Sequence, residues 1–307
     1  MRAFITGICG FAGRHLKFHL ESQGVEVWGA DLAKSGDPRI FPGDLSNREW
    51  FFPLLEKINP DVLFHLAAST SVGNSWKAPG ETLENNFTVT LRLLEWMRQR
   101  ENPPKLLLMG SAEVYGRRRT FPLREELVPH PLNPYAFSKF QAEESALFYH
   151  RNFHLPVFLI RAFNFTGPGQ SPVFVVPSFA KRIAAIERGE VSPTLEVGNL
   201  EARRDFSDVR DVVRALDLVV SKGTPGRVYN VCSGNSLRIA DLLGRLLSLA
   251  RRDIRFTSKA EKFRPNDIPR LEGSRERITE ECGWNPSVPL QKTLEDTLDY
   301  WRLQKQV

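Results

Sequence analysis

A tyrosine and a lysine lie four residues apart, at Tyr135 and Lys139, in the segment NPYAFSK. Asn133 is a favourable helix N-cap and Pro134 is well tolerated at the first helical position, so a helix is predicted to begin here. Residues four apart share one face of a helix, so the phenol and the ammonium are expected to point the same way. A nearby ammonium lowers the pKa of a tyrosine from its usual value of about 10. The spacing suits an acid–base pair, although two solvated residues give the same pattern more often.

Alternating strands and helices are predicted to position this pair. Apolar, β-rich runs lie at 2–6, 25–30, 62–67, 105–109, 157–163 and 228–232. Helix-like segments separate most of them, which is typical of an α/β fold with a doubly wound parallel sheet. From about residue 165 the pattern loosens, prolines recur in GPGQSPVFVVPS, and about the last 70 residues look helical with loops. We expect this smaller, mostly helical C-terminal region to pack at the carboxyl ends of the strands, where α/β proteins bind ligands.

A glycine-rich turn follows the first predicted strand. The segment TGICGFAG places Gly7, Gly10 and Gly13 three residues apart, which is a relative of the dinucleotide-binding fingerprint rather than a literal match. Such a turn lets the backbone approach a pyrophosphate closely and directs a helix N-terminus at the anion. Because a strand precedes the turn and a helical segment follows at 14–23, a dinucleotide is predicted to bind here.

An acid ends the second predicted strand. VEVWGAD ends in Asp31, 18 residues after Gly13, where an acid can hold the adenosine ribose hydroxyls. Asp31 is expected to repel a 2′-phosphate, which favours NAD(H), while Lys34 nearby keeps NADP(H) possible. In the segment GDLSN, Asp44 is a candidate acceptor for the adenine amino group.

The run VLFHLAAST is predicted to be a buried strand that ends in small residues, against which a nicotinamide ring can lie. His65 within it is interpreted as a core histidine rather than a catalyst. The full set of candidate cofactor-binding residues is Gly7, Gly10, Phe11, Ala12, Gly13, Asp31, Asp44, Leu45, Leu66, Ala67, Ala68, Tyr135 and Lys139.

Composition and charge narrow the class of protein. With 307 residues, 41% hydrophobic and 25% charged, the chain matches an ordinary globular protein of about two domains. No apolar run approaches 18 residues and the N-terminus lacks a signal-peptide pattern, so no membrane partner is expected. Cys9, Cys232 and Cys282 are too scattered for a disulfide framework or a metal site, which favours a cytoplasmic location. The net charge of +6 is spread over short clusters, so an anionic small substrate is expected rather than nucleic acid.

With the glycine turn, HLAAS, GSAEVYG and YAFSK in this order, the sequence resembles the extended short-chain dehydrogenase/reductase family from Gly7 to about Trp301. The resemblance implies a Rossmann-type fold and a candidate catalytic set of Ser111, Tyr135 and Lys139. In that family the tyrosine exchanges a proton with the substrate oxygen, and the serine hydrogen-bonds the same oxygen. The lysine lowers the pKa of the tyrosine and holds the ribose.

The resemblance also implies a division of the chain and an assembly. Residues 1–165 with about 207–236 are expected to form the NAD(P)-binding domain. Residues from about 166–206 with 237–307 are expected to form the sugar-nucleotide-binding domain. Predicted helices at about 80–100 and 135–152 carry apolar faces, and such helices commonly pair across a dimer in this family, so a homodimer is expected.

Within the family, RAFNFTGPGQSP, GNLEARRDFSDVRD and RPNDIPRLEGS resemble enzymes that act on GDP-mannose and its 4-keto-6-deoxy derivative. The resemblance implies a GDP-sugar substrate, and arginine forks suit its phosphates. The candidate substrate-binding residues are Thr70, Asn164, Lys181, Arg182, Arg204 and Arg264.

The two residues that follow Ser111 in the sequence, Ala112 and Glu113, help to distinguish a dehydratase from a reductase. In dehydratases that resemble this chain, these positions supply a proton donor and a base for removal of the C6 hydroxyl and the C5 proton. Glu113 can act as a base, but Ala112 has no proton to give. Glu113 therefore stays a catalytic candidate of undefined role, and reduction of a C4 ketone is favoured over 4,6-dehydration or epimerisation. A non-catalytic dinucleotide sensor is disfavoured, because the Ser-Tyr-Lys set is complete.

Overall fold

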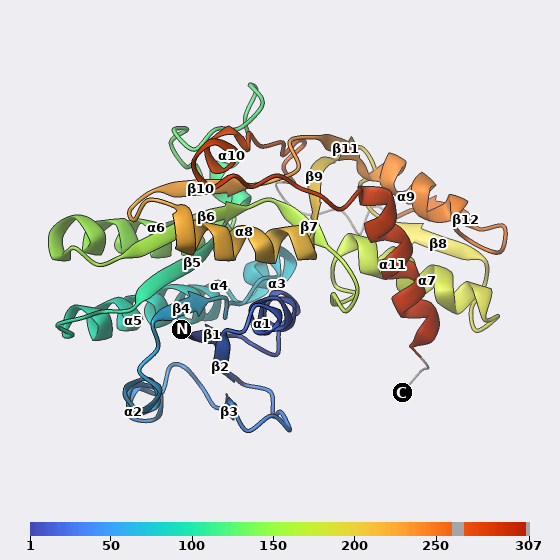
Figure 1. Ribbon diagram of the computed structural model, residues 1–307. Helices are drawn as coiled ribbons and strands as arrows, with labels where there is room; N and C mark the ends of the chain where they lie inside the picture. Colours follow the sequence, from blue (N-terminus) through green and yellow to red (C-terminus); the bar gives the residue numbers. More distant parts are fainter. Residues whose placement is uncertain (260–266, 305–307) are drawn as a thin grey trace.

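The computed structural model describes residues 1–259 and 267–304, and its larger sheet has seven parallel strands in the order β10-β6-β5-β4-β1-β2-β3 (Figure 1). These strands are β1 (Arg2–Thr6), β2 (Glu26–Asp31), β3 (Ile40–Pro42), β4 (Val62–His65), β5 (Lys105–Ser111), β6 (Val157–Ala162) and β10 (Val228–Val231). The chain runs outward from β1 through β2 and β3 on one side, and from β4 through β5 and β6 on the other. The strand order therefore reverses between β1 and β4, which is where ligands bind in such sheets.

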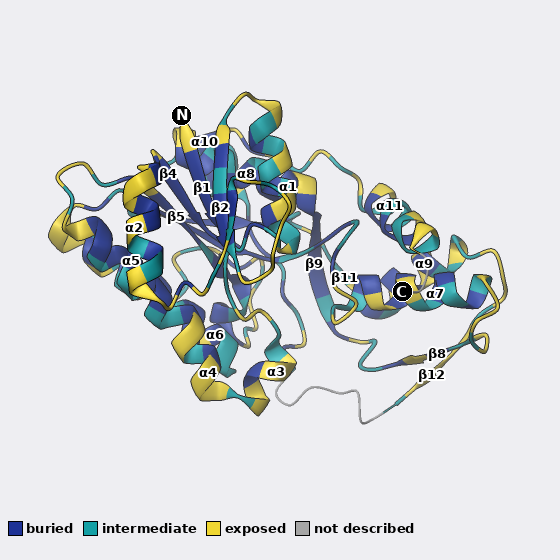
Figure 2. Cartoon of the chain, turned by 90° about the horizontal axis from the view of Figure 1, so that it is seen from below, coloured by how far each residue is buried: buried dark blue, intermediate teal, exposed yellow. Residues whose placement is uncertain are grey.

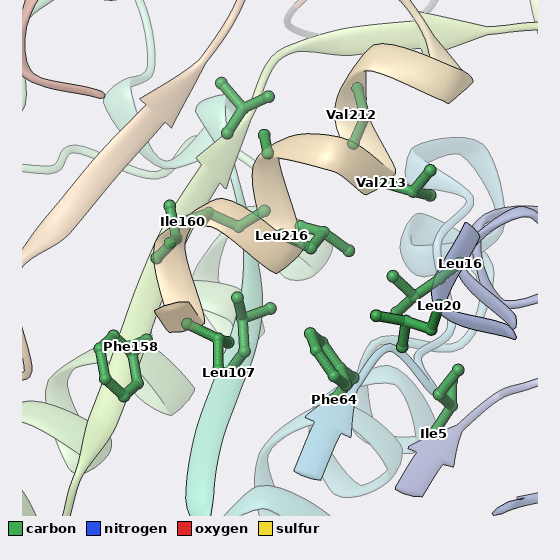
Figure 3. Packing of buried hydrophobic residues seen from close by; sticks show 14 of the residues in the cluster. Ile5, Leu16, Leu20, Phe64, Leu107, Phe158, Ile160, Val212, Val213 and Leu216 are labelled. Carbon is green, nitrogen blue, oxygen red and sulfur yellow. The ribbon is translucent and has the colours of Figure 1, made fainter. Parts of the chain in front are cut away.

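Alternating side chains of the strands build a hydrophobic core on each face of the sheet. Along β1, Ala3 and Ile5 belong to one core and Phe4 to the other. Figure 3 shows the first core, in which Leu16 of one helix and Leu216 of another lie over the strand residues. Burial on both faces explains why the strands read as continuous apolar runs in the sequence. Figure 2 shows the same strands as largely buried.

Helices cover both faces of this sheet. One face is covered by α1 (Phe11–Ser22), α8 (Val209–Lys222) and α10 (Glu276–Cys282). The other is covered by α2 (Arg48–Ile58), α5 (Val89–Arg98) and α6 (Pro134–Phe153). Shorter pieces precede α5 and follow β5: α3 (Val72–Lys77), α4 (Pro79–Leu83), the π-helix η1 (Glu84–Thr88) and the 3₁₀ helix η2 (Ala112–Tyr115).

A smaller body lies beside the carboxyl ends of the strands and has its own core (Figure 1). It contains a three-stranded sheet of β7 (Asn164–Thr166), β9 (Arg203–Asp208) and β11 (Ser236–Arg238), and a strand pair of β8 (Thr194–Val197) and β12 (Arg255–Ser258). Its helices are α7 (Val175–Glu187), α9 (Ile239–Ser248) and α11 (Leu290–Leu303). Apolar side chains of these three helices and of β8 and β9 form its core.

The predicted α/β class with a doubly wound parallel sheet is confirmed. The helix predicted at about 80–100 is divided into α4, η1 and α5. The division into two domains stays a prediction, and α10 packs against α8 and β10 of the larger body although it falls within 237–307. In the part of the chain that the structure describes, no helix is long and apolar enough to cross a membrane.

Candidate active site

A cavity of about 600 Å³ lies at the carboxyl ends of the parallel strands. Its walls come from the turn after β1, the ends of β2, β4, β5 and β6, the start of α6, and the segment 162–174. Every candidate cofactor-binding residue and all four candidate catalytic residues line it. The fold thus brings together side chains that are more than 100 residues apart in the sequence.

The glycine turn has the close backbone packing that a dinucleotide cradle requires. Gly7 adopts φ +71°, and a Cβ there would lie 2.9 Å from the backbone of Ala67. A Cβ on Gly13 would lie 2.2 Å from the carbonyl oxygen of Gly7. Gly10 is the N-cap of α1. The first three residues of this helix, Phe11, Ala12 and Gly13, line the cavity and are small or apolar. The residues present therefore fit a pyrophosphate at the N-terminus of α1.

Asp31 connects the glycine turn to the end of β2. Its Oδ2 accepts a hydrogen bond from the backbone N–H of Cys9 at 2.9 Å, and its Oδ1 accepts one from Ala33 at 3.0 Å. Asp44 lines the cavity nearby and accepts a hydrogen bond from the backbone N–H of Ser46 at 2.8 Å, which holds the pKa of this carboxyl below its usual value. Both carboxylates are thus held in place at the end of the cavity where an adenosine is predicted.

His65 lies in the core, as interpreted from the sequence. Its Nδ1 is 2.8 Å from Oγ1 of Thr6, and its Nε2 is 3.1 Å from Oγ1 of Thr90. Burial lowers the pKa of His65 to about 3, with the charge of Lys139 acting in the same direction. The imidazole therefore stays neutral and ties β1, β4 and α5 together behind the cavity.

Ser111, Tyr135 and Lys139 meet at the junction of β5 and α6. Ser111 ends β5, and Asn133 and Pro134 begin α6 as the sequence predicts, with Oδ1 of Asn133 accepting a hydrogen bond from the N–H of Ala136 at 2.8 Å. Lys139 is buried and its Nζ donates a hydrogen bond to the carbonyl oxygen of Met109 at 2.9 Å. This hydrogen bond connects α6, the helix that carries Tyr135 and Lys139, to the end of β5.

The pKa values in this group differ from the expectation for an isolated pair. Burial raises the pKa of Tyr135 to about 12; a hydrogen bond with Ser111 opposes this rise and the charge of Glu113 adds to it. Burial lowers the pKa of Lys139 to about 8. The pKa of Tyr135 therefore lies above that of a free phenol, because desolvation is the largest influence on it. The effect of Lys139 on this pKa stays a prediction. With this pKa the phenol of Tyr135 stays protonated at neutral pH, so it can donate a hydrogen bond to an oxygen atom of a ligand in the cavity.

Glu113 and Ala112 follow Ser111 in η2. The N–H of Glu113 donates a hydrogen bond to Oγ of Ser111 at 3.2 Å, and its Oε2 accepts one from Nδ2 of Asn133 at 3.1 Å. Ala112 also lines the cavity and presents a methyl group. The base candidate is thus in the site, and its neighbour has no exchangeable proton.

The candidate substrate-binding residues are divided by the structure. Thr70 and Asn164 line the cavity. Arg204 is buried elsewhere, where its Nη2 donates a hydrogen bond to Oδ1 of Asp267 at 2.7 Å. Lys181 lies over the ring of Trp301 at 5.4 Å, and Nη2 of Arg182 donates a hydrogen bond to the carbonyl oxygen of Thr194 at 3.4 Å.

Arg204, Lys181 and Arg182 are therefore not among the residues that line the cavity, and the geometry gives their assignment no support. Arg264 lies outside the described residues. Within the described ranges 1–259 and 267–304, no group of three or more His, Cys, Asp or Glu residues is arranged to hold a metal ion.

Several lining residues were not singled out from the sequence. Among them are Phe165, Gln170 and Phe174 in the segment after β6, and Leu271 near the C-terminal end of the chain. Phe165 stacks on Phe11 with ring centroids 5.7 Å apart, and Gln170 is buried with its Nε2 donating a hydrogen bond to the carbonyl oxygen of Phe165 at 3.0 Å. The sequence signal was the Pro/Gly-rich stretch GPGQSPVFVVPS, which indicated a loop but not which of its side chains face the ligand.

Known proteins resemble this chain along nearly all of its length. A family model described as GDP-mannose 4,6 dehydratase matches residues 4–297. The chain is 34% identical over 302 residues to the GDP-6-deoxy-D-mannose reductase of Pseudomonas aeruginosa, which covers 98% of this chain and 97% of that protein.

Two solved structures have the same fold. The structure of RMD from Pseudomonas aeruginosa complexed with NADPH matches with a TM-score of 0.87 at 34% identity, covering 98% of both chains. The UDP-glucose 4-epimerase of Thermus thermophilus in complex with NAD matches with a TM-score of 0.88 at 28% identity, covering 99% of both. The first of these two proteins thus binds NADPH and the second binds NAD.

Proposed function

The chain belongs to the GDP-mannose 4,6 dehydratase family, and from this premise we propose that it is an NAD(P)H-dependent 4-ketoreductase acting on GDP-4-keto-6-deoxy-D-mannose. Its product is a GDP-6-deoxyhexose such as GDP-rhamnose. The similarity to a GDP-6-deoxy-D-mannose reductase over 98% of the chain supports this reaction over 4,6-dehydration.

The observation that carries the proposal is the set of groups beside Tyr135. A ketone reduction needs hydrogen-bond donors at the carbonyl oxygen and one proton, which Ser111 and Tyr135 supply. A 4,6-dehydration also needs a proton donor for the departing C6 hydroxyl next to the base. Ala112, which lines the cavity beside Glu113, offers only a methyl group.

Ser111, Tyr135 and Lys139 have different roles in the proposed reduction. When bound, a reduced nicotinamide would supply the hydride that C4 receives. Ser111 and Tyr135 donate hydrogen bonds to the C4 oxygen, so the charge that develops there meets donors already in place. Tyr135, protonated because burial raises its pKa to about 12, gives up its proton to that oxygen. Lys139 is positively charged below its pKa of about 8, and its ammonium stabilises the phenolate that remains.

The dinucleotide is proposed to lie along the cavity from Asp31 to Tyr135. The N-terminus of α1 and the glycine turn would hold the pyrophosphate, with Asp31 and Asp44 at the adenosine end. Thr70 and Asn164 are proposed to contact the GDP-sugar, since both line the same cavity. Glu113 is proposed to position a sugar hydroxyl.

Mixing the purified protein with NADPH or NADH and GDP-4-keto-6-deoxy-D-mannose tests the proposal. We expect one equivalent of reduced cofactor to be consumed per sugar, as measured by loss of nicotinamide absorbance. Conversion of GDP-mannose to its 4-keto derivative without net cofactor consumption would instead identify a dehydratase. The initial rates with NADH and with NADPH show which cofactor the protein prefers, which the presence of both Asp31 and Lys34 does not determine.

We also propose that the protein is a cytoplasmic homodimer. Phe137 and Phe148 of α6 are 43% and 51% exposed, which supports an apolar contact along this helix. The three cysteines are all free thiols, which fits a reducing compartment. The molecular mass in solution, from sedimentation or light scattering, tests the dimer.

A further inference from the structure

A buried ion pair joins α6 to β6 behind the cavity. Nε of Arg161 donates a hydrogen bond to Oε2 of Glu143 at 3.1 Å, and Nη2 donates one to Oε1 at 2.6 Å. The two side chains are 5% and 1% exposed. Glu143 lies one helical turn beyond Lys139, which itself lies one turn beyond Tyr135, so all three are on one face of α6.

The same carboxylate lies over the strand that carries Ser111. A Cβ on Gly110, the residue before Ser111, would be 3.6 Å from Oε2 of Glu143. Gly110 is paired in the sheet with Arg161. The carbonyl oxygen of Ile160 is closer, at 2.5 Å, so the carboxylate of Glu143 lies at ordinary contact distance over this part of β5. The ion pair thus joins α6 to β6 next to the residue that precedes Ser111.

Arg161 also contacts the two segments that connect β5 to α6. Its Nη1 donates a hydrogen bond to the carbonyl oxygen of Glu125 at 3.1 Å, in the loop that leads to Asn133. Its guanidinium lies over the ring of Tyr115, 4.8 Å from the centroid, and Tyr115 ends η2, the turn that carries Ala112 and Glu113. One side chain thus contacts α6, η2 and the loop between them, which together carry Tyr135, Lys139 and Glu113.

We infer that Arg161 and Glu143 are positioning residues for the proposed reduction: they set the placement of Tyr135 and Lys139 relative to Ser111. The inference rests on the proposed function for its kinetic consequences. Neither side chain lines the cavity, so they act through the elements that they join. A buried pair is also poor evidence of stabilisation in itself, because its desolvation offsets much of the attraction.

The test replaces the pair without leaving a buried charge unpaired. The double variant Arg161→Met/Glu143→Met removes both charges and keeps similar volume, a change that often leaves stability intact. We expect kcat to fall about 10- to 100-fold, because a misplacement of about 1 Å has an effect of this size. KM for the reduced cofactor should change less than kcat does, since only Tyr135 and Lys139 among the candidate cofactor-binding residues lie on α6 and the glycine turn is not in contact with the pair.

A matched control comes from the smaller body. Arg302 and Glu187 join α11 to α7 through two hydrogen bonds of 2.8 and 2.7 Å, with side chains 18% and 7% exposed. The double variant Arg302→Met/Glu187→Met should leave kcat within about twofold of wild type. Equal losses of kcat in both double variants would show a general effect of removing ion pairs and overturn the inference.

If the double variant does not fold, the single variant Arg161→Lys tests the positioning role of Arg161 instead. Lysine keeps a positive charge beside Glu143 but has neither the fork nor the planar group that lies over Tyr115. A folded Arg161→Lys protein with wild-type kcat would overturn the inference; a fall of kcat at unchanged melting temperature would support it.

A second readout needs no substrate. The pKa of Lys139, measured by NMR on lysine labelled with ¹³C at Cε and assigned with Lys139→Arg, should be near 8 in the wild type and move upward in the Arg161 and Glu143 variants. An unchanged titration in these variants would contradict the inference. If the wild-type enzyme does not reduce the ketone, the proposed function fails, and this titration still tests the placement of α6.

Discussion

Asn133 holds the first turn of α6 and the carboxylate of Glu113 at the same time. Its Oδ1 accepts a hydrogen bond from the N–H of Ala136 at 2.8 Å, while its Nδ2 donates one to Oε2 of Glu113 at 3.1 Å. The residue that starts the helix carrying Tyr135 therefore also orients the acid that follows Ser111. Helix capping and the arrangement of the site depend on one side chain.

Substitutions of Asn133 should separate these two roles. Asn133→Ser keeps an oxygen that can cap α6 but cannot reach Glu113, so we expect stability close to wild type and a lower kcat. Asn133→Ala loses both contacts and should lower the free energy of unfolding by about 1 kcal/mol. Urea denaturation and steady-state kinetics of both variants measure the two effects. Equal stability of the two variants would contradict a capping role.

Tyr135→Phe removes the proton donor and leaves the shape of the cavity unchanged. We expect turnover to fall about 10²- to 10⁴-fold, the usual contribution of a positioned acid. Because the phenol is only one of many cofactor contacts, the affinity for the reduced cofactor should change little. Fluorescence titration of the cofactor measures this affinity, and a variant with near-normal turnover would exclude Tyr135 as the acid.

The depressed pKa of Lys139 predicts opposite effects of pH on stability and on activity. Burial lowers this pKa from 10.5 to about 8, so between pH 8 and 10.5 the unfolded chain binds more protons than the folded one. The free energy of unfolding contributed by Lys139 should therefore rise across this window, by about 2–4 kcal/mol in total.

In contrast, kcat/KM should fall as pH rises through about 8, because the ammonium that stabilises the phenolate is lost.

The pH dependence of stability is tested by comparing the denaturation of Lys139→Met with that of the wild type, both in the absence of cofactor. This variant should be more stable than wild type at pH 7 and lose that advantage by about pH 10; a constant difference would show that Lys139 does not titrate in this range.

Two glycines should respond in opposite directions to the same substitution. A Cβ on Gly13 would lie 2.2 Å from the carbonyl oxygen of Gly7, so Gly13→Ala should cost about 1–3 kcal/mol of stability and weaken cofactor binding. Gly244 is exposed within α9 and a Cβ there meets open space, so Gly244→Ala should stabilise the protein by about 0.5–1 kcal/mol. Thermal denaturation with and without cofactor measures both changes.

The sequence by itself determined most strands of the large sheet and the local chemistry of the site. The apolar runs predicted six of the seven strands of the large sheet, since strands buried on both faces have few polar residues. The short edge strand β3 at Ile40–Pro42 was missed because three residues give too little pattern. The glycine spacing, the Asn-Pro start of α6 and the Tyr135–Lys139 spacing are local features, and each lies where it was expected.

Only the tertiary structure decided which side chains share the cavity and what their environment does to them. Arg204 was predicted to bind a phosphate, and only the fold shows that its guanidinium pairs with Asp267; its role as a substrate ligand stays a prediction. The pKa of Tyr135 is raised rather than lowered, because burial depends on all the elements packed around the phenol and not on the residue four positions away. Likewise, Arg161 and Glu143 are 18 residues apart and become one contact only when β6 lies beside α6. Spacing along a chain fixes neighbours on one helix, whereas desolvation and long-range pairing arise when separate elements pack together.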